Sequence, residues 1–113
     1  MSNTETGQSG ESKASRYLHS NGYTVIDRNF RCRSGEIDII ATKDRTLYFI
    51  EVKTRATPRH GMPYEAVTTG KMRRMARAAQ YYLLTHDYRE WKMRYAVVSI
   101  LTREQTVKFY EIG

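Results

Sequence analysis

The pattern of hydrophobic and polar residues divides the chain into two helical and five extended segments. Apolar residues that recur every three or four positions predict helices, and clusters of β-branched and aromatic residues predict strands. The expected helices cover residues 9–20 and 64–85, and the expected strands cover residues 23–29, 36–42, 46–54, 94–101 and 106–112. This αβββαββ order predicts an α/β domain with a mixed central sheet flanked by helices.

Capping and turn residues set these boundaries. Ser9 is a candidate N-cap for the first helix, and Asn21-Gly22 is expected to end it. Residues 1–8 are mostly small and polar, so we expect a flexible tail before a single domain over residues 9–113. Both prolines fall within residues 55–63, which predicts a loop. The apolar stripe expected on the second helix consists of Met72, Met75, Ala76, Ala79 and Leu83.

Charged residues interrupt the two most apolar strands, "GEIDIIAT" and "TLYFIEVKT". Side chains two residues apart in a strand share a face. In the first of these strands, Glu36 and Asp38 should therefore point one way, while Ile37 and Ile39 point the other. In the second strand, the same rule places the two charged side chains of the "EVK" triplet on one face.

The connection between these strands decides whether their carboxylates meet. A turn on Asp44-Arg45 would put Asp38 directly across from Glu51, with the two Cβ atoms roughly 5 Å apart. Asp-Arg lacks the glycine that favours two-residue hairpin turns, and a slip of one residue would send the carboxylates to opposite faces. The register is therefore a hypothesis for the structure to test.

Two carboxylates at this separation repel each other unless a cation lies between them. Mg²⁺ is a suitable cation, because it takes one or two carboxylates and keeps several of its waters. Lys53, two residues after Glu51, would lie beside that ion and could stabilise developing negative charge. The alternative is a solvated sheet face on which Lys53 forms cross-strand salt bridges with Glu36 or Asp38. The apolar residues on both sides of these charges favour the metal site.

A further carboxylate is expected on the packing face of the first helix. Glu11 falls in the same stripe as Ala14 and Leu18, which should pack on the sheet. An acidic residue in such a position needs a cation or a lysine beside it. Glutamates near the start of a helix are also common because they interact favourably with the helix dipole, and both explanations stay open.

Composition narrows the classes of partner. The chain has 113 residues, 40% of them hydrophobic, and a net charge of +7. This charge suits nucleic acid or an anionic membrane surface, and it also occurs in basic proteins that bind neither. One cysteine and three histidines exclude an internal disulfide and disfavour zinc. No signal peptide or apolar run of about 20 residues is recognisable, so we expect a cytoplasmic protein without a membrane span.

The central motifs resemble those of a known superfamily. Asp38, followed after a hairpin by Glu51-Val52-Lys53, resembles the D…(D/E)-x-K signature of the restriction-endonuclease-like nucleases. The whole chain resembles the YraN-like family of small bacterial proteins assigned to that fold. The matching residues run nearly from end to end: Gly10-Glu11, Ala14, Tyr17-Leu18, Gly22-Tyr23, Asn29, Arg31, "GEIDII" (35–40), "EVKTR" (51–55), Gly61, Glu65-Ala66-Val67 and Lys71.

The resemblance implies a restriction-endonuclease-like fold and a role for each motif residue. Asp38 and Glu51 correspond to metal ligands and catalytic residues, and Lys53 corresponds to the catalytic lysine. Glu11 matches the helix-borne glutamate that related junction-cutting nucleases contribute to the metal site. The implied cofactor is Mg²⁺ or Mn²⁺, and the implied activity is endonucleolytic cleavage of DNA, including branched or otherwise structured DNA. The chain departs from the family at Ala96, where an aspartate is usual.

Several basic residues near these motifs are candidates for phosphate contacts. They are Arg55, Arg59 and His60 after the second central strand, and Lys71, Arg73, Arg74 and Arg77 off the apolar stripe of the long helix. We expect the helix residues to lie in solvent, where they could also be ordinary solvated charges. Besides an endonuclease, the sequence leaves open a non-catalytic nucleic-acid-binding module, a protein-interaction factor in DNA processing, and a homodimer.

Overall fold

The computed structural model describes residues 3–57 and 68–112, with side chains from residue 10 onward. Helix α1 spans Asn3–Ser20 and α2 spans Thr69–Thr85. The strands are β1 (Thr24–Cys32), β2 (Gly35–Lys43), β3 (Thr46–Arg55), β4 (Lys92–Leu101) and β5 (Thr106–Glu111). The predicted αβββαββ order is confirmed. No helix of the described part of the chain is both long and apolar enough to cross a bilayer.

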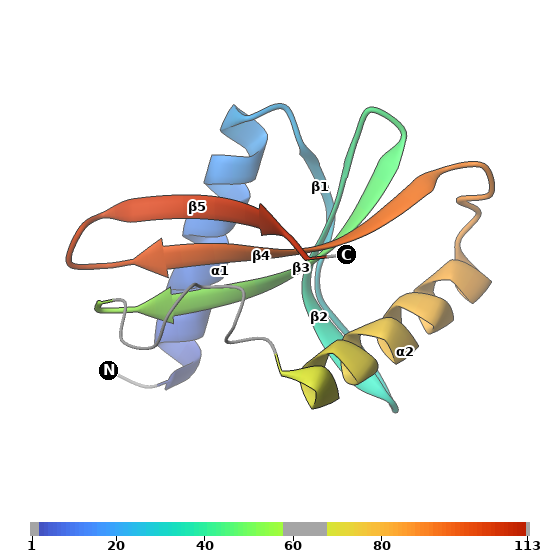
Figure 1. The fold of residues 1–113 in the computed structure, drawn as a ribbon, viewed down its shortest axis with the longest axis horizontal. Coiled ribbons are helices and arrows are strands. Elements are labelled where there is room, and N and C mark those ends of the chain that lie inside the picture. Colours follow the sequence, from blue (N-terminus) through green and yellow to red (C-terminus); the bar gives the residue numbers. More distant parts are fainter. Residues whose placement is uncertain (1–2, 58–67, 113) are drawn as a thin grey trace.

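The five strands form one sheet in the order β1-β2-β3-β4-β5 (Figure 1). Strands β3 and β4 run parallel, and the other neighbours run antiparallel. A parallel pair needs a crossover connection, which α2 supplies between β3 and β4. The sheet is therefore mixed, as predicted.

The helices cover opposite faces of the sheet, and each closes its own hydrophobic core. The core on the α1 side consists of Ala14, Leu18, Ile39, Ala41, Ile50, Ala96, Val98 and Ile100. The core on the α2 side consists of Ile37, Ile40, Leu47, Phe49, Ala78, Ala79 and Tyr82. Because both faces are covered, the central strands are apolar on both sides, which explains their nearly continuous hydrophobic runs.

Both helices begin elsewhere than predicted. Helix α1 begins at Asn3, six residues before the expected start near Ser9. The intervening residues contain no proline, and Gly7 has the lowest helix propensity among them, which a helix tolerates. The flexibility of residues 1–8 stays a prediction. Helix α2 begins at Thr69, because Thr68 has extended backbone angles and its side chain caps the Lys71 N–H. The predicted residues 64–67 of this helix, with the loop residues 58–63, lie outside the described residues.

The apolar stripe of α2 is shifted slightly from its predicted position. Its fully buried residues are Met75, Ala78, Ala79 and Tyr82. Three residues expected in the stripe are only half-buried: Met72, Ala76 and Leu83. The ring of Tyr82 packs edge-on against both Phe30 and Phe49. This large aromatic residue determines which side of α2 faces the sheet, and the buried stripe lies on that side.

The predicted hairpin register is confirmed. Asp44 and Arg45 both have positive φ, at 50° and 53°, as a type I′ turn requires. Pairing runs from Lys43 with Thr46 to Ile39 with Ile50, so every pair fits a turn centred on Asp44-Arg45. The ladder ends at Ile39–Ile50. Asp38 and Glu51 are thus the first residues beyond the last pair, at the point where β2 and β3 separate.

The expected side-chain alternation fails at this point. Ile39 packs in the core on the α1 side, but Ile37 packs in the core on the α2 side, so the prediction that they share a face is wrong. On β1, the pairs with these two isoleucines flank Asn29, whose φ is 54°. A left-handed residue interrupts the regular pleat. The β1–β2 hairpin therefore bends beside Asp38 and leaves β3.

Candidate functional site

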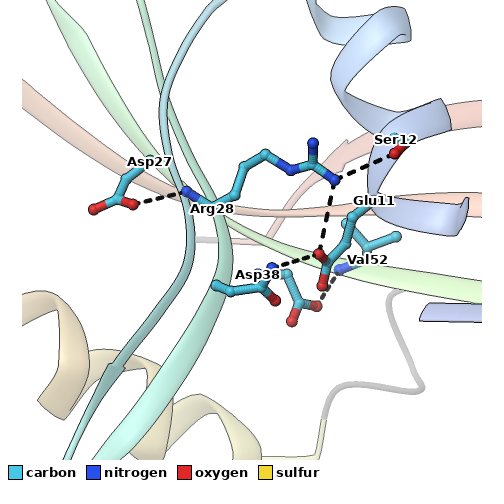
Figure 2. Close-up of polar contacts among 7 residues, drawn as sticks. Glu11, Ser12, Asp27, Arg28, Asp38 and Val52 are labelled. Atoms are coloured by element: carbon cyan, nitrogen blue, oxygen red, sulfur yellow. Dashed lines mark hydrogen bonds and ion pairs between the residues drawn. The ribbon is translucent and has the colours of Figure 1, made fainter. Parts of the chain in front are cut away.

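The bend places Asp38 against the backbone of β3. Its Oδ2 atom accepts a 2.8 Å hydrogen bond from the Val52 N–H (Figure 2). This side-chain contact begins where the backbone ladder between the strands ends. Asp38 is thereby fixed beside Glu51, as the predicted register required.

Burial and neighbouring carboxylates make ionisation of Asp38 unfavourable. Burial and the nearby charge of Glu51 raise the Asp38 pKa to about 7, and the charge of Glu11 contributes further. The hydrogen bond from Val52 opposes the shift without cancelling it. Asp38 therefore holds its proton up to near-neutral pH unless a cation compensates for the surrounding negative charge.

Glu51 faces α2 and is neutralised from there. It is 5% exposed, and its Oε1 atom is contacted directly by the Lys71 ammonium. Lys53, on the same strand face, has its Nζ atom 3.7 Å from the same oxygen. The expectation that Lys71 lies in solvent is therefore wrong. Lys71 lies in the first turn of α2, three residues after the N-cap Thr68, and from there its long side chain reaches Glu51 on the sheet.

The two lysines influence each other. The pKa of Lys53 is lowered by burial and by the hydrogen bond and charge of Lys71. Burial acts to lower the pKa of Lys71 as well, but hydrogen bonds to Glu51 and Lys53 raise it overall. Lys71 is thus the main counter-charge of Glu51, and Lys53 is the lysine that gives up its proton more readily.

The cross-strand alternative for Lys53 is not seen. Glu36 pairs instead with Arg31, at 3.3 Å between Nε and Oε2, and both side chains are largely exposed. Of these four residues, Glu36, Asp38, Glu51 and Lys53, only Glu36 behaves as an ordinary surface charge. Asp38, Glu51 and Lys53 stay together.

Glu11 approaches the same place from α1. Its carboxylate is mostly buried and accepts a 2.8 Å hydrogen bond from Asn29 Nδ2, with Arg28 Nη2 at 3.9 Å (Figure 2). Burial beside Ala14 and Leu18 confirms the predicted packing face. Its counter-charge is Arg28, which also donates to the Ser12 hydroxyl at 3.4 Å.

Each of the three carboxylates is held by a different partner. Across the described residues, no three His, Cys, Asp or Glu side chains come close enough to form a ready-made metal-binding group. Asp38 and Glu51 nevertheless fit a hard divalent cation by their chemistry, since half-buried Asp38 and buried Glu51 are oxygen donors whose negative charges oppose each other. Glu11, turned toward Asn29 and Arg28, adds negative potential to this pair.

The predicted basic residues lie in different surroundings. Arg73, Arg74 and Arg77 are exposed on α2, as expected, and Arg55 is half-buried at the end of β3. Arg59 and His60 fall outside the described residues. The structure also brings Arg28 and Asn29 into the site, which the sequence interpretation had given no role. Asn29 is one of the residues that match the family pattern, which was the available signal.

Comparison with known proteins agrees with this pattern. The model of uncharacterised protein family UPF0102 matches residues 10–100. A UPF0102 protein of Chlorobium limicola is 50% identical over 84% of this chain and 74% of its own length. One from Caldicellulosiruptor saccharolyticus is 42% identical over 88% of this chain and 85% of its own length. One from Chlorobium phaeobacteroides is 46% identical over 95% of this chain and 83% of its own length. The chain therefore belongs to UPF0102, the YraN-like family that its sequence motifs indicated.

Proposed function

We propose that the protein is a metal-dependent endonuclease that hydrolyses phosphodiester bonds in DNA. The observation that carries this proposal is the meeting of half-buried Asp38 and buried Glu51 with Lys53 and Lys71 at the opening of the β2–β3 hairpin. Holding two carboxylates together inside a protein is unfavourable, as the raised pKa of Asp38 shows. A domain that only needed a stable sheet would place apolar residues there.

The proposed roles follow from chemistry and exposure. Asp38 and Glu51 would hold Mg²⁺ or Mn²⁺, and Glu11 would strengthen cation binding through its charge. A bound divalent ion supplies Lewis acidity and lowers the pKa of a bound water. Lys53 is 29% exposed, so its ammonium can reach a phosphate and neutralise charge that develops on the phosphate oxygens.

The choice of nucleic acid as substrate is supported by charge. The chain carries +7, and exposed arginines of α2 follow Lys71 along the helix. Contacts of this kind position a phosphate backbone without reading bases. We propose DNA, including branched or otherwise structured DNA, as the substrate class.

A second candidate function is nucleic-acid binding without cleavage. The observation that favours it is the Lys71 ammonium on Glu51, which neutralises the carboxylate without any metal. In this case Asp38 and Glu51 would serve only to position the two lysines against a phosphate.

A cleavage assay separates the two. Linear, nicked and four-way DNA substrates are incubated with Mg²⁺ or Mn²⁺, with EDTA as the negative control. We expect cleavage by the wild type and its loss, by a factor of 100 or more, in Asp38→Asn and Lys53→Met, but not in Asp44→Asn on the exposed hairpin turn. Binding without cleavage of any substrate would support the non-catalytic function instead.

A further inference from the structure

A cleft opens beside the carboxylate site, between the β1–β2 turn and the first half of α2. Its volume is about 430 Å³. Its lining includes Arg31, Arg33 and Ser34 from the hairpin and Lys71, Arg74 and Met75 from the helix. Lys71 lines the cleft and also contacts Glu51, so the cleft and the carboxylate site are continuous.

The two walls of the cleft are in close backbone contact. A Cβ atom added at Gly35 would lie 2.5 Å from the carbonyl oxygen of Arg74 and 3.1 Å from its Cβ. No residue other than glycine lets the hairpin approach the helix this closely. The contact fixes the distance between the arginines of the turn and those of α2, so the cleft exists before any ligand binds.

The charge of the cleft is strongly positive. Of the described residues that line the cleft, Arg31, Arg33, Lys71 and Arg74 contribute four cations against one carboxylate, Glu36. Glu36 is exposed, and its ion-pair partner within the described part of the chain is Arg31. Among the described residues, neither Arg33 nor Arg74 has an ion-pair partner. A concave surface with an excess of unpaired guanidinium groups is suited to phosphate oxygens, which these groups bind in a bidentate manner.

We propose that this cleft binds the phosphodiester backbone of a nucleic-acid strand that extends from the carboxylate site. The proposal rests on the proposed function in one respect, which is that the ligand is nucleic acid. It does not require that the nucleic acid is cleaved. Lys71 connects the two regions, and Arg33 and Arg74 contact phosphates farther along the strand. The turn arginines Arg31 and Arg33 thereby join the interface, which the sequence interpretation had confined to α2 and the segment after β3.

The first test measures binding in EDTA, where no cleavage can occur. A fluorescein-labelled 20-base-pair DNA duplex is titrated with wild type, Arg33→Glu, Arg74→Glu and the matched charge reversal Lys92→Glu. Lys92 is exposed and lies at the start of β4, where it pairs with Thr46, five residues before Glu51 on β3. We expect each cleft variant to weaken binding about tenfold or more, and Lys92→Glu to weaken it less than threefold.

The second test uses Cys32, which lines the cleft and is the only cysteine of the chain. The rate at which a maleimide labels its thiol reports whether the cleft is filled. We expect saturating DNA to slow labelling at least fivefold, and inorganic phosphate at the same phosphate concentration to have no such effect. Cys32→Ser is the control for reaction elsewhere.

Each result has a defined meaning. Equal weakening by Lys92→Glu and Arg33→Glu, or labelling that DNA leaves unchanged, would overturn the cleft proposal. Protection by inorganic phosphate alone would identify a small-anion site and overturn it too. If the cleft variants lose binding while no substrate is cleaved with Mn²⁺, the cleft proposal stands and the nuclease proposal fails. If cleavage is observed but the cleft variants bind DNA as tightly as wild type does, the nuclease proposal stands and the cleft proposal fails.

Discussion

At the scale of single residues, the counter-charge of Glu51 comes from another element of the fold. Lys71 belongs to α2, whereas Lys53 lies on the same strand as Glu51 and stays farther from its carboxylate. A divalent cation at Asp38 and Glu51 would compete with this ammonium for the same oxygen. Lys71 is therefore expected to stabilise the metal-free protein and to oppose metal binding.

Replacing Lys71 tests this competition. We expect Lys71→Met to bind Mn²⁺ several-fold more tightly than wild type in calorimetry, because one positive charge is removed from the site. The same variant should have a lower melting temperature in EDTA, because Glu51 loses its main buried partner. Arg74→Met, an exposed residue one turn along α2, is the control and should change neither quantity appreciably. Unchanged Mn²⁺ affinity in Lys71→Met would contradict the competition.

Asp38 provides a prediction for pH. Its pKa is about 7 in the folded protein, compared with about 3.9 in an unfolded chain. The folded state therefore binds this proton more tightly than the unfolded state. In EDTA, the free energy of unfolding should decrease as pH rises from about 4 to about 7 and should change little from this group above that range.

The matched variant is Asp38→Asn, which keeps the acceptor for the Val52 N–H but cannot ionise. We expect it to match wild type near pH 3, below both pKa values, and to exceed it at pH 8 by on the order of 3–4 kcal/mol in urea unfolding. Asp44→Asn, on the exposed turn, should leave the pH dependence unaltered. A wild type and an Asp38→Asn variant with parallel pH profiles would show that Asp38 ionises normally.

At the scale of elements, Gly35 controls how α2 docks on the β1–β2 hairpin. Its missing side chain leaves room for the backbone of Arg74, so Gly35→Ala must push the helix outward. We expect this variant to lose about 1–3 kcal/mol of unfolding free energy, the usual effect of overpacking. Gly70→Ala, where the nearest atom to the added Cβ is the end of Arg74 at 4.0 Å, should be neutral or slightly stabilising. Chemical denaturation of both variants measures the difference.

The elements that could be predicted from sequence are those fixed by local chemistry. The Asp44-Arg45 turn set the hairpin register even without glycine, because aspartate tolerates a positive φ and the apolar residues on both sides pack in only one register. The last residues of both helices, Ser20 and Thr85, also agreed with the prediction. In each case the signal lies within a few residues of the feature.

The features that sequence could not predict depend on contacts between distant segments. Strand alternation alone predicted that Ile37 and Ile39 share a face of the sheet. The sequence of β2 contains no sign that Asn29 of the neighbouring strand β1 adopts a left-handed conformation. The Lys71 contact with Glu51 depends on the position of Thr68, which is the N-cap of α2. Motif spacing identified Asp38, Glu51 and Lys53 as neighbours, but their partners come from other elements.

At the scale of the whole molecule, the site lies at the junction of the two cores. Glu11 approaches from the α1 side of the sheet and Lys71 from the α2 side, and Asp38 experiences the charge of both. The bend of the β1–β2 hairpin makes this possible, because it opens the sheet between β2 and β3 where the two layers would otherwise be separated. Charges from both layers can therefore act on one ligand.

The last prediction concerns the salt dependence of DNA binding by the whole surface. Arg74 lies in the cleft beside α2, and Arg55 lies at the end of β3, two residues after Lys53. A backbone that crosses the site would contact both. Since each phosphate contact releases a counterion, the logarithm of affinity should fall steeply with the logarithm of salt concentration. We expect Arg74→Ala and Arg55→Ala each to reduce that slope by about one, and the double variant by about two.

Anisotropy titrations between 50 and 200 mM salt, roughly the range over which such losses are large, measure the slopes. Duplexes of unrelated sequence should give nearly the same affinity, because these contacts position the backbone and do not read bases. Lys92→Ala is the control for a change in net charge alone and should leave the slope unchanged. If Arg55→Ala reduces the slope no more than Lys92→Ala does, the strand does not pass Arg55, and the backbone follows the cleft away from the end of β3. If wild-type binding shows no salt dependence, phosphate recognition is wrong for the whole surface.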